Sequence, residues 1–356
     1  MHLGIPALLD FYRAHKEDDS LVLVTIIGTE GSTYRKPGAM MLIGRDQEFR
    51  GMISGGCLEG DLLHHAAEVF ASGEPKFVTY DMHASDELVW NLGLGCDGVI
   101  HLLLQRLDRE GGFGFFQQLE SSHKARRMVM LALKIAPGGE LPVGASALID
   151  DGEAGVGEMA LLQVLRRTSG QNWPQWRYHL VGLAESSSAP EVMLINMPPR
   201  VRVLVCGAGP DAVPVARTLS ELDWEVVVID HRPAYAKPGR FPESCRVVQA
   251  RPENLAEALD LDELDAAVIM SHHLENDSEY LRQLAGRNMT YIGCLGPRAR
   301  STRLKEMVGC EQLQVHGPVG LDIGAELPEA IALSLAAEIH AKLNKRSGLS
   351  LTPSSH

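Results

Sequence analysis

A glycine-rich stretch at residues 201–232 has the residue types needed to bind the phosphate of a nucleotide. An apolar run leads into Gly207 and Gly209, and a helical pattern and a second apolar run then end on Asp230. Glycines let the backbone turn tightly and approach a ligand, and the N–H groups that open a helix attract an anion. Dinucleotide-binding folds place their ribose-binding carboxylate about 20 residues further on. Gly207, Gly209 and Asp230 are therefore candidate ligand-binding residues.

The residues that follow the glycines fit an ordinary nucleotide site less well. If Asp211 is the N-cap of the helix, Pro214 occupies the third helical position, where its missing N–H costs nothing. The same assignment directs a carboxylate at the place where a pyrophosphate would bind. Arg232 could accept a ribose phosphate or could be a surface arginine. The stretch by itself leaves dinucleotide binding open.

Further polar groups follow the later apolar runs of the same region. Ser271, His272 and His273 end one run, and residues 293–298 follow the next and open a helix that carries arginines. Ligands of parallel sheets bind beyond the carboxyl ends of the strands, where these groups should gather. His272 either faces a ligand or is hydrogen-bonded to loop backbone.

A polar loop at residues 31–38 carries two adjacent cations, Arg35 and Lys36, together with hydroxyl groups and two glycines. Exposed N–H groups and positive charge together suit a phosphate or a carboxylate. The alternative is a solvated hairpin loop.

A glycine corner, Ser54-Gly55-Gly56-Cys57, precedes a predicted helix. A thiol at a helix start is in surroundings that lower its pKa, and it can act as a nucleophile or a soft-metal ligand. Cys96, in GLGCDG, is a second candidate, and an inert buried thiol is the alternative for both. The six cysteines contain no CxxC pair, so we expect free thiols in a reducing compartment rather than a structural zinc site.

The hydrophobic pattern divides the chain into two domains and a tail. Residues 1–197 mix short apolar strands with helices at 5–15, 58–71 and 158–166, which predicts an α+β domain of undetermined strand order. Two prolines mark the boundary. Residues 198–344 then alternate strand and helix, which predicts a Rossmann-type α/β fold with a doubly wound parallel sheet, and residues 345–356 form a polar, mobile tail. Strands are predicted at residues 21–29, 39–44, 49–53, 76–81, 99–104, 128–135, 147–149, 178–182, 192–197, 201–206, 225–230, 247–249, 266–271 and 290–292, with a last helix at 328–344.

Composition excludes several classes of function. The 356 residues carry a formal net charge of -13, which argues against binding to a nucleic acid backbone. There is no secretory signal pattern and no apolar run long enough to cross a bilayer. We expect a cytoplasmic protein with no membrane partner.

The motifs together resemble the XdhC/CoxI family, accessory factors that mature molybdenum hydroxylases such as xanthine dehydrogenase. The matching stretches include GTEGSTYRKPGAMMLIG, GMISGGCLEGDL and LGLGCDG in the first domain, and AAVIMSHHLENDSEYL, YIGCLGPRARSTRL and VHGPVGLDIGAELPEAIALSLAAEI in the second. The resemblance covers both domains, apart from residues 108–199. Asp97 departs from the family pattern, which usually continues GCGG, so Cys96 is a weaker candidate than Cys57.

The resemblance implies a chaperone that binds the molybdenum cofactor, or molybdopterin, between its domains, protects it and passes it to an apo-hydroxylase. The cofactor is a pterin with a metal-holding dithiolene and a terminal phosphate. It would be bound by the following residues, with Cys57 near the metal: Arg35, Lys36, Ser54, Gly55, Gly56, Cys57, Gly207, Gly209, Asp230 and His272. A homodimer, contact with a cysteine desulfurase and no turnover of its own are further implications.

Two other functions remain open at this point. The chain could be an NAD(P)-dependent oxidoreductase with His272 or His273 as the acid–base group. It could also be a scaffold in which the Rossmann-type unit has lost its ligand and only docks a partner.

Overall fold

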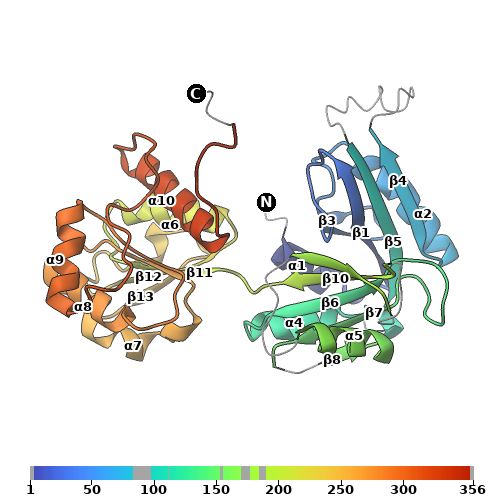
Figure 1. The fold of residues 1–356 in the computed structure, drawn as a ribbon, viewed down its shortest axis with the longest axis horizontal. Helices are drawn as coiled ribbons and strands as arrows, with labels where there is room; N and C mark the ends of the chain where they lie inside the picture. Colours follow the sequence, from blue (N-terminus) through green and yellow to red (C-terminus); the bar gives the residue numbers. More distant parts are fainter. Residues whose placement is uncertain are drawn as a thin grey trace. The chain divides into compact units, whose positions relative to one another are not determined.

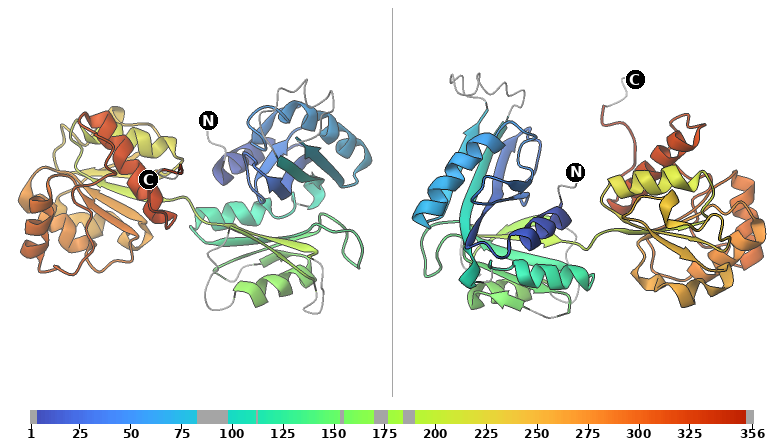
Figure 2. Two further views of the ribbon diagram at one scale, coloured as in Figure 1. Left: turned by 45° about the horizontal axis from the view of Figure 1, so that its top comes forward. Right: turned by 180° about the vertical axis from the view of Figure 1, so that it is seen from behind.

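The computed structural model describes residues 4–82, 98–111, 113–152, 155–169, 177–183 and 190–352. The chain forms two compact units, Met1–Pro199 and Arg200–His356, each with its own sheets and core (Figures 1 and 2). The predicted boundary after residue 197 lies close to this division.

The first unit contains an antiparallel sheet built around the long strand β1 (Ser20–Gly31). The strand order is β3 (Phe49–Gly51), β2 (Met40–Ile43), β1, β5 (Gly98–Asp108) and β4 (Lys76–Asp81). The apolar, β-branched start of β1 is buried on both faces, because successive side chains of a strand point to opposite sides. One set packs on α2 (Glu59–Ser72), and the other packs towards α1 (Ile5–His15).

A second antiparallel sheet completes the first unit. Its order is β8 (Gly155–Gly157), β7 (Ser146–Asp150), β6 (Val129–Lys134), β10 (Val192–Met197) and β9 (Tyr178–Val181). One face shares a core with α1, with β1 and with α4 (Phe116–Lys124), and the other is covered by α5 (Met159–Ser169). The unit is therefore α+β, as predicted, but the order of its strands was not predictable from the pattern.

The second unit has one five-stranded parallel sheet. Its order is β13 (Arg246–Gln249), β12 (Glu225–Asp230), β11 (Arg202–Cys206), β14 (Ala266–Ile269) and β15 (Tyr291–Cys294), with every neighbouring pair parallel. Helices α6 (Ala212–Glu221) and α10 (Pro328–Leu343) pack on one face. The other face is covered by α7 (Leu255–Ala258), α8 (Leu274–Leu284) and α9 (Arg298–Val308). The predicted Rossmann-type, doubly wound α/β fold is confirmed.

The sheet order determines where a site can form in the second unit. The chain runs from the central strand β11 to β12 and β13 on one side, and then crosses to β14 and β15 on the other. The loops after β11, β12 and β14 therefore lie at the carboxyl edge near this change of direction. None of the helices in the described part of the chain is long and apolar enough to cross a membrane.

Candidate functional site

Three glycine-bearing motifs of the first unit meet at one end of its first sheet. A methyl group added to Gly55 would lie 3.8 Å from the ring of Tyr34, so the 31–38 loop contacts the glycine corner. A methyl group added to Gly98, the last residue of GLGCDG, would lie 2.6 Å from the carbonyl oxygen of Ser32. Only glycine allows this approach of the two backbones. Cys96 and Asp97, from the same motif, lie outside the described residues.

The glycine corner is closed around a carboxylate of its own helix. Glu59, the first residue of α2, is 5% exposed and accepts hydrogen bonds from the N–H groups of Ile53 (3.0 Å), Ser54 (2.9 Å) and Gly56 (2.9 Å). The Ser54 hydroxyl donates a further bond at 2.6 Å. Burial tends to raise the pKa of Glu59, but these hydrogen bonds outweigh it and leave the pKa below its usual value.

The corner therefore presents a thiol to solvent, while Glu59 engages the N–H groups of Ile53, Ser54 and Gly56. Ser54 and Gly56, which the family resemblance places in the cofactor site, have their backbone donors engaged by Glu59. The Gly55 and Gly56 φ angles of 117° and 116° explain the two glycines, since other residues rarely adopt them. Cys57 is exposed and free. Of the residues predicted at this corner, it has the reactive group most accessible to a ligand.

The cationic loop next to the corner is ordered by its own hydrogen bond. The hydroxyl of Thr33 donates to the carbonyl oxygen of Arg35 (2.9 Å), and the ammonium of Lys36 lies 3.5 Å from the same hydroxyl. Arg35 is half-buried and Lys36 is exposed. Burial lowers the pKa of Arg35, and the nearby charge of Arg177 lowers it further.

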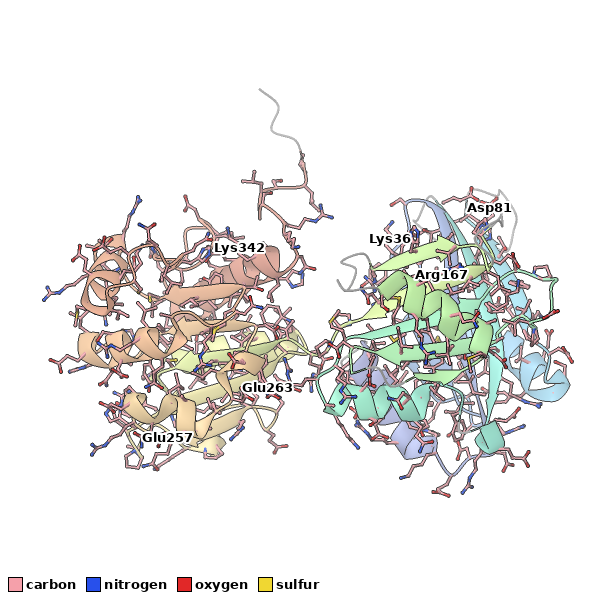
Figure 3. All side chains as sticks on the ribbon, turned by 60° about the horizontal axis from the view of Figure 1, so that its bottom comes forward. Lys36, Asp81, Arg167, Glu257, Glu263 and Lys342 are labelled. Atoms are coloured by element: carbon pink, nitrogen blue, oxygen red, sulfur yellow. The ribbon has the colours of Figure 1, made fainter. Side chains whose placement is uncertain are left out.

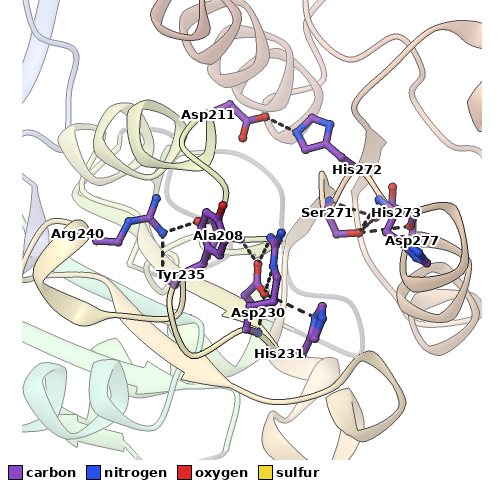
Figure 4. Close-up of polar contacts among 11 residues, drawn as sticks. Ala208, Asp211, Asp230, His231, Tyr235, Arg240, Ser271, His272, His273 and Asp277 are labelled. Atoms are coloured by element: carbon purple, nitrogen blue, oxygen red, sulfur yellow. Dashed lines mark hydrogen bonds and ion pairs between the residues drawn. The ribbon is translucent and has the colours of Figure 1, made fainter.

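In the second unit, Asp230 holds the glycine turn together (Figure 4). Its carboxylate is 2% exposed and accepts from the N–H of Ala208 (2.8 Å), the N–H of Arg232 (2.9 Å) and the Arg232 guanidinium (2.9 and 2.7 Å). Burial tends to raise the pKa of Asp230, but the Arg232 and Ala208 bonds hold it below its usual value. The carboxylate predicted to bind a ribose has its acceptor positions occupied by the protein.

The turn itself is shaped by close packing. Gly207 has a φ of 116°, and a methyl group there would lie 2.7 Å from the carbonyl oxygen of Met270, just after β14. The guanidinium of Arg240 donates to the carbonyl oxygens of Ala208 (2.6 Å) and Tyr235 (2.8 Å). Glycine at position 207 is required for contact between two strand ends, whether or not a ligand binds there.

A hydrogen bond connects the helix start after the glycine turn to the loop that follows β14. Asp211 is the N-cap residue of α6, as expected, but its side chain makes no capping hydrogen bond. Its carboxylate instead lies 2.7 Å from Nε2 of His272 (Figure 4). His272 has a positive φ of 62°, which is uncommon for a residue with a side chain. His272 thus faces a carboxylate from the glycine turn, rather than the loop backbone that was its alternative partner.

Two more buried carboxylates order loops of the second unit. Asp277, 1% exposed, accepts from the N–H of Ser271 (3.1 Å) and from the guanidinium of Arg300 (2.6 Å). Glu338 accepts from the hydroxyl of Tyr291 (2.6 Å), from His316 Nδ1 (2.9 Å) and from the N–H of Gly320 (2.7 Å).

The structural role of Glu59 and Glu338 was missed by the sequence analysis. An acid in the first turn of a helix, three residues after a pair of glycines, was the available signal for Glu59. Glu338 lies within the apolar stripe of α10, where a charged residue needs buried partners.

Comparisons with known proteins give matches to both units. A family described as "XdhC and CoxI family" matches residues 14–81, and one described as "XdhC Rossmann domain" matches residues 203–339. A Bacillus subtilis protein, named as a probable subunit of xanthine dehydrogenase, is 32% identical over 95% of this chain and 96% of its own length. The Escherichia coli molybdenum cofactor insertion chaperone PaoD is 23% identical over 94% and 87%. A crystal structure from Bacillus halodurans, titled as a xanthine dehydrogenase, is 30% identical with a TM-score of 0.80, and the match covers 99% of this chain and 98% of that one.

The Glu338 network predicts an acid-dependent contribution to stability. Burial tends to raise the Glu338 pKa, but hydrogen bonds from His316, Tyr291 and Gly320 lower it to about 2. Because the folded pKa lies below the unfolded one, the contribution is complete above the unfolded value of about 4.3 and is lost as the pH falls towards 2. Glu338→Gln should cost about 2 kcal/mol at pH 7 and about half of that at pH 3, as measured by urea unfolding. Glu329→Gln, at an exposed position of α10, is the control, and equal losses at both pH values would contradict the prediction.

The glycine corner should depend on the charge of Glu59. Glu59→Gln replaces one acceptor oxygen with an NH₂ group that faces N–H donors, so we expect a loss of about 2 kcal/mol in the free energy of unfolding at pH 7. Glu68→Gln, at an exposed position of α2, should change it by less than about 0.5 kcal/mol. A Glu59→Gln protein as stable as the parent would show that the corner does not need its carboxylate.

Proposed function

This chain belongs to the XdhC and CoxI family, and on that premise we propose that it is a molybdenum cofactor chaperone. It binds the cofactor, protects it and delivers it to a molybdenum hydroxylase such as xanthine dehydrogenase. The observation that carries the proposal is the exposed thiol of Cys57 on a preformed glycine corner, beside an aromatic ring and a cationic loop. The name of PaoD, a relative across almost the whole chain, supports it.

The donor set of the first unit suits the parts of this cofactor. A thiolate is a soft ligand of the kind that molybdenum–sulfur chemistry requires, so Cys57 would lie near the metal. The ring of Tyr34 is 64% exposed beside Gly55 and offers a face to a flat pterin. Arg35 and Lys36 supply positive charge for a terminal phosphate. Ser54, Gly55 and Gly56 would position the thiol through their bonds to Glu59, rather than contact the ligand by their own N–H groups.

We propose that the chain delivers a cofactor rather than catalyses a reaction, although two similar proteins are named as a xanthine dehydrogenase or a subunit of one. An NAD(P)-dependent reaction would need a ribose at Asp230, whose carboxylate is bound by Arg232. It would also bring a pyrophosphate against the carboxylate of Asp211. We therefore propose that Gly207, Gly209, Asp230 and His272 form a protein-ordered surface, which contributes to cofactor or partner binding without a nicotinamide.

The family resemblance also implies an oligomeric state, a cellular location and a second partner. We propose that the chain works as a homodimer in the cytoplasm, and that a cysteine desulfurase is a second partner. Light scattering of the purified protein tests the dimer. Co-purification with an apo-hydroxylase and with a desulfurase tests the two partners separately.

The thiol of Cys57 should be needed for cofactor retention. Cys57→Ser removes the soft ligand at an exposed position, so we expect the fold to stay stable and cofactor retention to fall on the order of tenfold. Molybdenum analysis and pterin fluorescence of the purified protein measure this. Cys310→Ser, which changes a free cysteine of the second unit, is the control. Unchanged retention in Cys57→Ser would remove Cys57 from the site.

The competing functions give different binding profiles. Titration of the parent protein with NADH, NADPH and molybdopterin, followed by fluorescence, should show capture of the pterin alone. Tight nicotinamide binding without pterin binding would support an oxidoreductase instead. Capture of an apo-hydroxylase without binding of any small ligand would support a scaffold.

A further inference from the structure

Two arginines of the first unit have no anionic partner among the residues that the structure describes. Arg35 is half-buried in the 31–38 loop, and Arg177 directly precedes β9. Within the described ranges, neither guanidinium forms an ion pair with a carboxylate. Arg177 is exposed, but Arg35 is partly buried, and long cationic side chains are seldom withdrawn from water without a partner. The half-buried Arg35 therefore requires an explanation.

Backbone packing brings the two segments together at one end of β10. A methyl group added to Gly38, at the end of the cationic loop, would lie 3.2 Å from Cγ2 of Ile195. Ile195 pairs with Tyr178, and the N–H of the next residue, Asn196, donates to the carbonyl oxygen of Arg177 at 2.8 Å. Figure 3 shows Lys36, from the same loop, beside the strands of this second sheet. The segments that carry Arg35 and Arg177, which are far apart in the sequence, therefore lie side by side.

The electrostatics of Arg35 agree with this geometry. Burial lowers its pKa most, and the positive charge of Arg177 lowers it further, opposed in part by Tyr34. A partly desolvated cation with a like charge nearby raises the free energy of the folded protein. An anion bound between them would relieve both effects.

We infer that Arg35 and Arg177 form a binding site for the phosphate group of a small molecule. Guanidinium groups present paired N–H donors that match phosphate oxygens, and a phosphate dianion can neutralise both arginines where a single carboxylate neutralises one. The exposed ring of Tyr34, next to Arg35 in the chain, provides a flat surface for the remainder of the ligand. The ligand class is a phosphorylated planar ring compound. Its identification with the pterin cofactor rests on the proposed function, whereas the phosphate site does not.

Arg177 is the residue that this inference adds. It lies outside both regions matched by the family descriptions, and no motif of the sequence pointed to it. Arg166, in the last turn of α5, is a suitable control, because it is exposed and forms no ion pair in the described part of the unit.

The test is thermal unfolding in inorganic phosphate and in chloride at equal ionic strength. Phosphate should raise the Tm of the parent and of Arg166→Gln, and should leave the Tm of Arg177→Gln and Arg177→Glu unchanged, because a ligand stabilises only the state that binds it. In chloride, Arg177→Glu should have a higher Tm than Arg177→Gln, because the new carboxylate pairs with Arg35. Equal phosphate stabilisation of all four proteins, or an Arg177→Glu protein less stable than Arg177→Gln, would overturn the site.

Cofactor retention by the same proteins separates this inference from the proposed function. We expect Arg177→Gln to retain molybdopterin on the order of tenfold less tightly than the parent, since charged hydrogen bonds to a phosphate are lost. If parent and variant retain it equally, the phosphate site is wrong and the chaperone function stands. If the phosphate effects appear as expected but the parent retains no pterin, the chaperone function is wrong and the phosphate site stands.

Discussion

Buried carboxylates that accept backbone N–H groups hold the candidate surfaces of both units in shape. Glu59 orders the glycine corner, Asp230 orders the glycine turn, and Asp277 and Glu338 order the neighbouring loops. Loop N–H groups buried without an acceptor would each cost about 1–3 kcal/mol. A carboxylate that several donors approach stays ionised even when buried, as the lowered pKa of Glu59 and Glu338 indicates. The loops therefore have a defined conformation before any ligand binds.

The same carboxylates decide which groups remain available to a ligand. Glycine-rich corners at helix starts are typical anion sites, but here the anion is supplied by the protein itself. The accessible groups are side chains instead: the thiol of Cys57, the ring of Tyr34 and the guanidinium groups of Arg35 and Arg177. This set suits a ligand that has a soft metal, a flat ring and a phosphate.

The second unit shows that a nucleotide-binding fold does not imply a nucleotide-dependent reaction. Its sheet order and glycine turn are those of a Rossmann-type domain. However, the pairs Asp230–Arg232 and Asp211–His272 engage the groups that would otherwise meet a ribose and a pyrophosphate. Function depends on such local groups rather than on the fold, which hosts many activities.

The sequence by itself determined the type of each unit and most of its strands. Apolar, β-branched runs specify buried strands, and regular βαβ alternation allows little except a right-handed parallel sheet. It also identified the glycine positions, because a turn or a close approach requires that residue. The partner of each polar group was decided only by the tertiary structure. Three examples are the hydrogen bonds of Glu59 to the glycine corner, the pairing of β6 with β10, and the effect of the Arg177 charge on Arg35. The physical reason is that residue patterns encode local conformation and burial, whereas contacts between distant segments depend on how the whole core packs.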